Sequence, residues 1–192
     1  MNLGFDIDGV ISDFVKTFSE LVEIRYDVKL NEAEIYCHDL NLVLGITKNE
    51  RNQLITETLR KDLPLNHGAK ATLERLSSEG HKICLLTARS GVPVEVTKDW
   101  LKRNSIPYTE LFQLSEGEKY HANVSLDLIV EDCLQDALEW SQKVKNILVY
   151  DHPWNKTLNV KNLIKRVYSW DEIYEEVQRL KASSAEVPQL MR

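Results

Sequence analysis

The stretch FDIDGVISD, from Phe5 to Asp13, places Asp6 and Asp8 two residues apart at the end of the first hydrophobic run. Residues i and i+2 of a strand point to the same side of a sheet, so the two carboxylates are expected to share one site. Neighbouring carboxylates repel one another unless a positive charge lies between them. The stretch therefore predicts a strand that ends at a cation-binding site.

Length and composition indicate a folded globular protein. The chain has 192 residues, of which 43% are hydrophobic and 28% charged, enough for one core with a smaller insertion. A net charge of −6 argues against nucleic acid polymers and anionic membranes as partners, so the expected partner is a small molecule. Neither a signal peptide nor a membrane span is recognisable, and we expect a cytoplasmic protein. The oligomeric state stays open, a homodimer included.

Residues 13–63 are expected to be helical throughout, because their apolar residues recur at helical spacing and no strand-like run interrupts them. Phe14, Phe18, Leu21 and Val22 form one apolar stripe. Two further helix starts are indicated by N-cap and N3 pairs, Asn31 with Glu34 and Thr47 with Glu50. The segment is predicted to be a small helical cap of three or four helices, called the helical insertion below.

From residue 64 onward, apolar runs alternate with helical patterns, which is typical of parallel strands joined by crossover helices. The expected strands are KICLLTA, ELFQL, LDLIV and NILVY, with helices over 69–79, 93–103 and 134–143. A last helix is expected to start after Ser169 and end near Lys181. The predicted fold is α/β, a Rossmann-like parallel sheet made of residues 1–12 and 64–182, followed by a poorly ordered tail over 183–192. The three cysteines, Cys37, Cys84 and Cys133, have unrelated spacings and are expected to be free thiols.

Ligands of parallel sheets bind where the strands end and the loops emerge. Polar residues follow every expected strand: Asp6 and Asp8, Thr87, Lys119, Glu131 and Asp132, and Asp151. Carboxylate oxygens suit a hard cation, and Mg²⁺ uses one or two of them together with waters and substrate phosphate. With Mg²⁺ bound, one aspartate can attack phosphorus while its neighbour exchanges a proton with the leaving alcohol and with water. Thr87 would bind a phosphate oxygen, and Lys119 would balance charge.

The order of these motifs resembles the haloacid dehalogenase superfamily of phosphatases over the whole chain. More narrowly, DIDGVISDF, YDHPWN and VYSWDEI look like the 5'(3')-deoxyribonucleotidase group and related bacterial proteins. The resemblance implies that Asp6 is the nucleophile and Asp8 the acid/base. It implies that Thr87, with Ala88 beside it, and Lys119 bind phosphate. It also implies that Asp6, the Asp8 carbonyl and Asp132 hold Mg²⁺, with Glu131 behind them, and that Phe14 lines the base pocket.

Two positions depart from the group's pattern. The sequence has Thr87, Ala88 and Arg89 where Thr-Ser-Pro is common, and Glu131 with Asp132 where two aspartates are common. Arg89 has two open interpretations, a substrate contact in the pocket or a surface charge. Glu131 is interpreted either as a supporting acid or as a solvated one, and Asp136 as a helix-surface acid. Phe14 could equally belong to the core of the helical insertion.

The expected function is Mg²⁺-dependent hydrolysis of nucleoside monophosphates through an aspartyl-phosphate. The alternatives keep the chemistry with a sugar phosphate or another small phosphate ester, or replace it with a phospho-acceptor signalling module. A receiver domain has its acidic pair early and its lysine last, whereas Lys119 precedes Glu131 and Asp132 here. Neither a zinc-type histidine spacing nor an ATP-binding G-x-x-x-x-G-K-[ST] motif occurs in the sequence.

Overall fold

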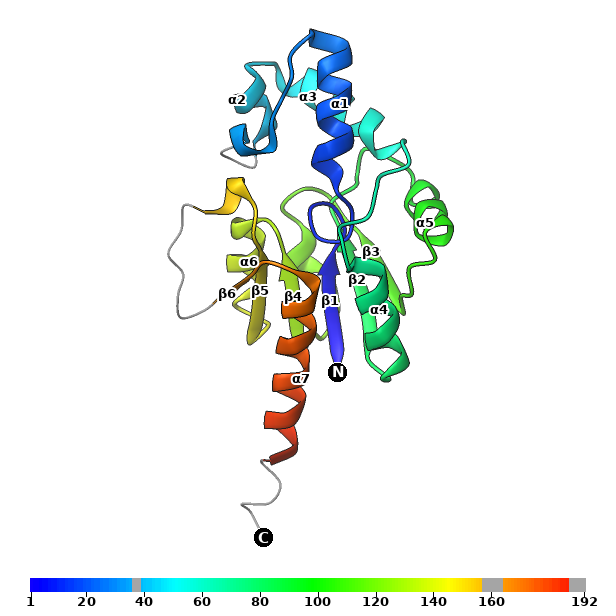
Figure 1. Ribbon diagram of the computed structural model, residues 1–192, viewed down its shortest axis with the longest axis vertical. Helices are drawn as coiled ribbons and strands as arrows, with labels where there is room; N and C mark the ends of the chain where they lie inside the picture. The colour runs from blue at the N-terminus through cyan, green and yellow to red at the C-terminus, as the bar shows by residue number, and fades with distance from the viewer. Residues whose placement is uncertain (36–38, 157–163, 187–192) are drawn as a thin grey trace.

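The strands form one six-stranded sheet in which every neighbouring pair is parallel (Figure 1). The computed structural model describes residues 1–35, 39–156 and 164–186. Across the sheet the order is β3-β2-β1-β4-β5-β6. The strands are β1 Asn2–Asp6, β2 Lys82–Thr87, β3 Glu110–Gln113, β4 Leu128–Glu131, β5 Asn146–Tyr150 and β6 Lys165–Val167. The predicted Rossmann-like sheet is confirmed, and β6 is a strand that the prediction lacks.

Helices cover both faces of the sheet, because alternate strand residues point to opposite sides. Leu3 and Phe5 of β1 belong to the hydrophobic cluster that also contains residues of α4 Ala69–Ser78, α5 Val94–Arg103 and α7 Trp170–Glu186. Cys84 and Leu86 of β2 belong to the other cluster, together with residues of α6 Leu134–Trp140. Asp6 and Glu131 are the last residues of β1 and β4. By the alternation along each strand, their side chains lie on the face of this second cluster.

The described part of the helical insertion contains α1 Phe14–Tyr26, the 3-10 turn η1 Glu32–Glu34, α2 Leu40–Leu44 and α3 Lys48–Leu59, and no strand of the sheet. It has a hydrophobic cluster of its own, in which Phe18 and Val22 of α1 pack with Leu54 of α3. Figure 1 shows these helices beyond the carboxyl end of β1. The division of the chain into a core and this insertion stays a prediction.

The chain enters and leaves the helical insertion through two segments that lie side by side. Ser12 and Leu65 form an antiparallel bridge, and the Asp13 N–H donates to the Pro64 carbonyl at 2.8 Å. The Asn66 side chain donates to the carbonyls of Gly9, at 3.1 Å, and Val10, at 2.8 Å. These bonds tie the loop after β1 to the start of the second half of the core.

Three local predictions need correction. The Asn31 and Glu34 pair forms its capping box at a 3-10 turn and not at an α-helix. Helix α7 continues to Glu186, beyond the predicted end near Lys181; the C-terminal tail stays a prediction, since residues 187–192 lie outside the described part. Helix α6 ends at Trp140, three residues earlier than predicted.

Two of the three cysteines can be placed. Cys84 and Cys133 are free thiols, and Cys37 lies outside the described residues. Within the described ranges, no helix combines the length and the apolar character that crossing a membrane requires.

Candidate active site

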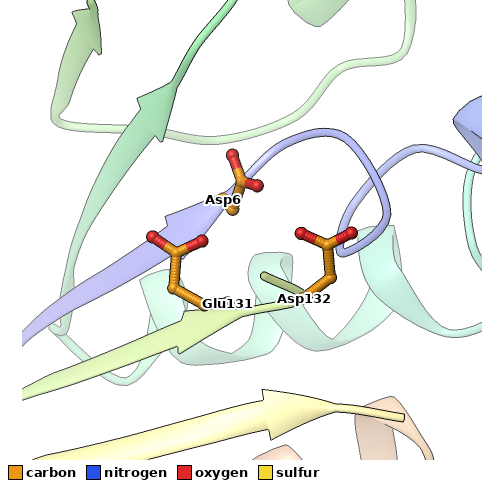
Figure 2. A group of neighbouring side chains, drawn as sticks. All are labelled: Asp6, Glu131 and Asp132. Atoms are coloured by element: carbon orange, nitrogen blue, oxygen red, sulfur yellow. The ribbon is translucent and has the colours of Figure 1, made fainter. Parts of the chain in front are cut away.

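Three buried carboxylates meet at the carboxyl ends of β1 and β4 (Figure 2). Asp6 ends β1, Glu131 ends β4 and Asp132 follows it, and their exposed fractions are 6%, 0% and 4%. One oxygen of each lies within 4.8 Å of one oxygen of each of the others. Because β1 and β4 are parallel neighbours, their ends necessarily lie together. The strand numbers increase outward on both sides of β1, the topological switch point at which open α/β sheets bind ligands.

Lys119 is the cation that the structure places in this acid cluster. It begins the 3-10 turn η2 Lys119–His121 and is 3% exposed. Its Nζ lies 2.6 Å from Glu131 Oε2, 2.8 Å from Asp136 Oδ2 and 3.1 Å from Asp6 Oδ2. One ammonium therefore faces three carboxylates, with Asp132 as a fourth acid close by.

Burial and neighbouring carboxylates shift the pKa values of these groups. Burial raises the pKa of Asp6 well above the usual carboxyl range; Glu131 and Asp132 raise it further, although Lys119 lowers it. Burial likewise raises the pKa of Glu131 to about 7, against the lowering effect of Lys119. For Lys119, burial lowers the pKa, but the charges of Asp6, Glu131 and Asp136 outweigh this and raise it. A further cation would stabilise the ionised acids.

Asp132 is held by the segment that follows β5. Trp154, in the 3-10 turn η3 Pro153–Asn155, donates from Nε1 to Asp132 Oδ2 at 3.1 Å. The Asn155 amide donates to the Asp132 carbonyl at 2.8 Å and is itself bound by Arg166 of β6. On the other side Gly9 has φ +86°, and a Cβ there would lie 2.3 Å from Asp132 Oδ2. Only glycine allows the loop after β1 to come this close.

Asp8 stands apart from the three-carboxylate cluster. Arg89 donates to its two oxygens, from Nε at 2.8 Å and from Nη2 at 2.7 Å. Ser12 Oγ also donates to Asp8 Oδ1, at 2.8 Å. The two aspartates of FDIDGVISD therefore have different partners, Lys119 for Asp6 and Arg89 for Asp8.

A cavity of about 500 Å³ connects these groups with the helical insertion. Its polar lining includes Asp6, Asp8, Lys119 and Asp132, and its lining from the insertion includes Phe14, Leu40, Arg51, Asn52 and Ile55. Ala88 and Arg89 contribute the loop after β2. Thr87 does not line the cavity, but it directly follows the β2 residue paired with Asp6, and its buried Oγ1 has no hydrogen-bond partner among the described residues.

Comparison with known proteins identifies the family. A family model described as "5' nucleotidase, deoxy (Pyrimidine), cytosolic type C protein" matches residues 1–183. The chain belongs to this family. A nucleotidase of Clostridium acetobutylicum is 28% identical over 185 residues, which cover 94% of this chain and 95% of that protein.

Solved structures confirm the fold of this type C nucleotidase family member. A structure titled as a predicted phosphatase from Clostridium acetobutylicum superposes with a TM-score of 0.66 at 13% identity, covering 93% of this chain and 98% of that one. A hydrolase of the haloacid dehalogenase superfamily from Ehrlichia chaffeensis gives a TM-score of 0.58 at 15% identity, covering 93% and 96%. The resemblance to this superfamily is confirmed, and the protein is a hydrolase of phosphoric monoester bonds.

Most of the residues predicted for the site lie together in this nucleotidase family member, while their chemical roles stay predictions. Asp6, Lys119, Glu131 and Asp132 form the acid cluster, and Asp8, Phe14, Ala88 and Arg89 line the same cavity. One expectation is wrong, because Asp136 binds Lys119 and is no helix-surface acid. Of the two open interpretations of Arg89, the surface charge is excluded, since the residue is 2% exposed. Asp151, which follows β5, faces Arg166 at 2.7 Å and does not line the cavity.

Several residues that support the site from a distance were not predicted from the sequence. Asp136 lies in the first turn of the helix that follows Asp132, and its closeness in sequence to the acidic pair was a usable signal. Trp154 and Asn155 lie in YDHPWN, where the resemblance alone singled them out. His152 contacts Gly9 and Glu32, both of which lie far from it in the sequence, and no local pattern indicates these contacts.

Proposed function

We propose that this protein hydrolyses nucleoside monophosphates, with Mg²⁺ as cofactor and an aspartyl-phosphate on Asp6 as intermediate. The observation that carries the proposal is the buried cluster of Asp6, Glu131 and Asp132, which shares one ammonium and opens to a cavity that the helical insertion also lines. Buried acids of this kind, with strongly raised pKa values in a cleft, are typical of catalytic sites.

The residues present fit Mg²⁺. The cluster offers hard oxygen ligands only, and it lacks positive charge in the presence of Lys119. Asp6 and Asp132 would hold the ion together with the Asp8 carbonyl, and Glu131, already bound to Lys119 and Trp140, would support them. When bound, the ion neutralises phosphoryl charge. The proposed reaction needs an ion of this kind, because phosphoryl transfer depends mainly on such charge stabilisation.

Two steps follow from the arrangement of the side chains. Asp6 attacks phosphorus, an Asp6 O–P bond forms and the bond from phosphorus to the leaving oxygen breaks, while Asp8, which enters this step carrying a proton, gives it to that oxygen. Water then attacks the phosphorus, Asp8 takes a proton from it, and the Asp6 O–P bond breaks to release inorganic phosphate. Lys119 holds Asp6 in place and favours its ionised form, and Thr87 Oγ1, which has no hydrogen-bond partner among the described residues, would donate to a phosphoryl oxygen.

The lining from the helical insertion favours a nucleoside over a smaller ester. Phe14, Leu40 and Ile55 offer apolar surface for a planar base, and Asn52 and Arg51 offer hydrogen-bonding groups for its edge. In this proposal the insertion acts as a cap that excludes water while the ester bond breaks. The cytoplasmic location expected from the sequence stays a prediction.

The proposal is tested with the purified protein and a panel of nucleoside monophosphates, sugar phosphates and p-nitrophenyl phosphate, each with Mg²⁺ and with a chelator. We expect sustained Mg²⁺-dependent release of phosphate, most efficient with a nucleoside monophosphate, and none from the Asp6→Asn variant. Preference for a sugar phosphate would contradict the substrate class alone. A protein that releases no phosphate beyond one equivalent would contradict the reaction.

A further inference from the structure

Arg89 is a buried arginine that points both of its forked donors at Asp8. Nε and Nη2 donate to different oxygens of the carboxylate, at 2.8 and 2.7 Å, so the contact fixes both the position and the plane of the carboxylate. Asp8 itself is partly exposed, with 24% of its side-chain surface accessible, whereas the Arg89 side chain is 1% exposed. The rigid partner is the arginine, and the aspartate is the group that reaches the cavity.

Neighbouring elements hold Arg89 in this orientation. Its guanidinium lies 5.0 Å from the ring centre of Trp100, a buried residue of α5 whose indole donates to the Leu63 carbonyl. Its carbonyl accepts from Gln113 Nε2 at 2.8 Å, and Thr97 donates to the other end of the same amide at 2.8 Å. Residues of α5 and β3 therefore fix both ends of the arginine.

The charged groups of the site form two sets, each with its own cation. Lys119 serves Asp6, Glu131 and Asp136, and Arg89 serves Asp8 alone among the described acids. A further donor, Arg89 Nη1, is buried and has no hydrogen-bond partner among the described residues. A side chain that both binds Asp8 and lines the cavity can hold Asp8 against a ligand oxygen.

We propose that Arg89 is a positioning residue for Asp8, and that it holds the carboxylate where it exchanges a proton with the leaving oxygen. The proposal rests on the proposed function, since it assigns Asp8 the proton transfer described above. A direct phosphate contact is the competing role for Arg89. The two roles differ in measurable ways, because a phosphate contact acts on every substrate alike, whereas positioning of Asp8 acts only where the leaving oxygen needs a proton.

The first experiment compares two substrates in Arg89→Met, which keeps most of the side-chain volume, and in Arg89→Lys, which keeps the charge but lacks the fork. With a nucleoside monophosphate we expect kcat of Arg89→Met to fall about 10²-fold, the typical result of misplacing a reacting group. With p-nitrophenyl phosphate, whose alcohol leaves without help, we expect a much smaller fall. Arg103→Met, which removes an exposed guanidinium from α5, is the matched control and should behave as wild type.

A double variant tests whether Arg89 acts through Asp8. Asp8→Asn with Arg89→Met should be no slower than Asp8→Asn alone, since the positioned group is already absent. Equal losses on both substrates, a rise in KM as the main effect, or losses that multiply in the double variant would overturn the proposal. If Arg89→Met does not fold, Arg89→Lys carries the same comparison, with the double variant as the fold control because it leaves no unpaired charge.

Rescue by a small molecule distinguishes positioning from general loss of structure. Methylguanidinium added to Arg89→Ala should restore part of the rate with a nucleoside monophosphate, and methylammonium should restore less, because only the guanidinium reproduces the fork. Equal rescue of the rate by methylguanidinium and methylammonium would contradict the proposal. If the wild-type protein hydrolyses no phosphate ester, the proposed function has failed separately. Crystal structures of wild type and Arg89→Met then decide whether Asp8 changes orientation, as the proposal requires.

Discussion

Among the described side chains, the Trp154 indole N–H is the donor to the Asp132 carboxylate. Because hydrogen bonds from supporting residues orient metal ligands, their loss typically lowers metal affinity by 10- to 100-fold. We therefore expect Trp154→Phe, which keeps a ring to stack on His152, to raise the Mg²⁺ concentration for half-maximal activity at least about tenfold. Trp140→Phe is the matched control, since it removes an indole donor from Glu131, which Lys119 still holds. An unchanged Mg²⁺ requirement in Trp154→Phe would remove Asp132 from the metal site.

A comparison of Gly9 with Gly80 distinguishes the effect of backbone strain from the effect of contact with the site. An alanine at a positive φ costs roughly 1 kcal/mol wherever it occurs. Gly9→Ala would in addition place its Cβ against Asp132 Oδ2, whereas Gly80→Ala, at φ +82°, would meet nothing within 4 Å. We expect both variants to melt at a lower temperature and only Gly9→Ala to lose its activity and its response to Mg²⁺. Full activity in Gly9→Ala would show that Asp132 is free to move.

At the scale of elements, η1 of the helical insertion and η3 of the core meet through one histidine. His152 Nδ1 lies 3.1 Å from Glu32 Oε1, and Nε2 lies 2.7 Å from the Gly9 carbonyl. Both partners are acceptors, so both contacts are hydrogen bonds only when the imidazole carries two protons. On the other side of the cavity Arg51 of α3 pairs with Glu116 at 3.1 Å. Among the described residues, three ion pairs thus tie the insertion to the core, these two and Arg103 with Asp62, and the first contains a histidine.

The pKa shifts of His152 and Glu32 predict how the strength of this contact changes with pH. Burial lowers the pKa of His152, but the Glu32 hydrogen bond, the Asp132 charge and the Gly9 carbonyl together raise it above its usual 6.5. The hydrogen bond from His152 lowers the pKa of Glu32 below its usual 4.5, and Lys156 contributes to this. A raised histidine pKa gives stability that is complete below about 6.5 and is lost as the pH rises through the folded value. The lowered pKa of Glu32 gives stability that is present above about pH 4.5 and is lost as the pH falls through the pKa of Glu32 in the folded protein.

Hydrogen exchange measured against pH tests this contact. We expect amides of η1 and the loop after β1 to be best protected between about pH 5 and 6.5 and to lose protection above the raised pKa of His152. Glu32→Gln should reduce this pH dependence, and Glu34→Gln, a change in the same turn at a residue without a contact to His152 in the structure, should keep it. Protection that rises with pH in the wild-type protein would contradict the assigned charge state.

At the scale of the whole molecule, the buried strands and their crossover helices were predictable from the sequence. Strands covered on both faces consist of nearly continuous apolar residues, such as those of β2, β4 and β5, and helices between them carry clear start signals. Strand β6 escaped prediction because it has three residues at the sheet edge, and only Val167 is buried. The capping box at Asn31 fixes a helix start but not a length, and no buried residue in η1 extends it.

The site was predictable to the extent that topology determines it. Residues directly after parallel strands must meet at one edge, which brought Asp6, Glu131 and Asp132 together. What the sequence leaves open is the pairing of charges. Arg89 is close to Asp8 only because α5 and β3 direct its side chain there, and His152 meets Glu32 across 120 residues. Such pairs depend on tertiary packing, which local patterns do not contain.

In the proposed mechanism Asp6, and not Asp8, carries the phosphoryl group. The most direct measurement mixes the protein with Mg²⁺ and a nucleoside monophosphate, quenches the reaction in acid during turnover, reduces the acyl phosphate with borohydride and locates the reduced residue by mass spectrometry. We expect modification at Asp6 in the wild-type protein, modification of the same residue in Asp8→Asn when p-nitrophenyl phosphate replaces the nucleotide, and none in Asp6→Asn. Modification at Asp8, or turnover in Asp6→Asn at the wild-type rate, would contradict this mechanism.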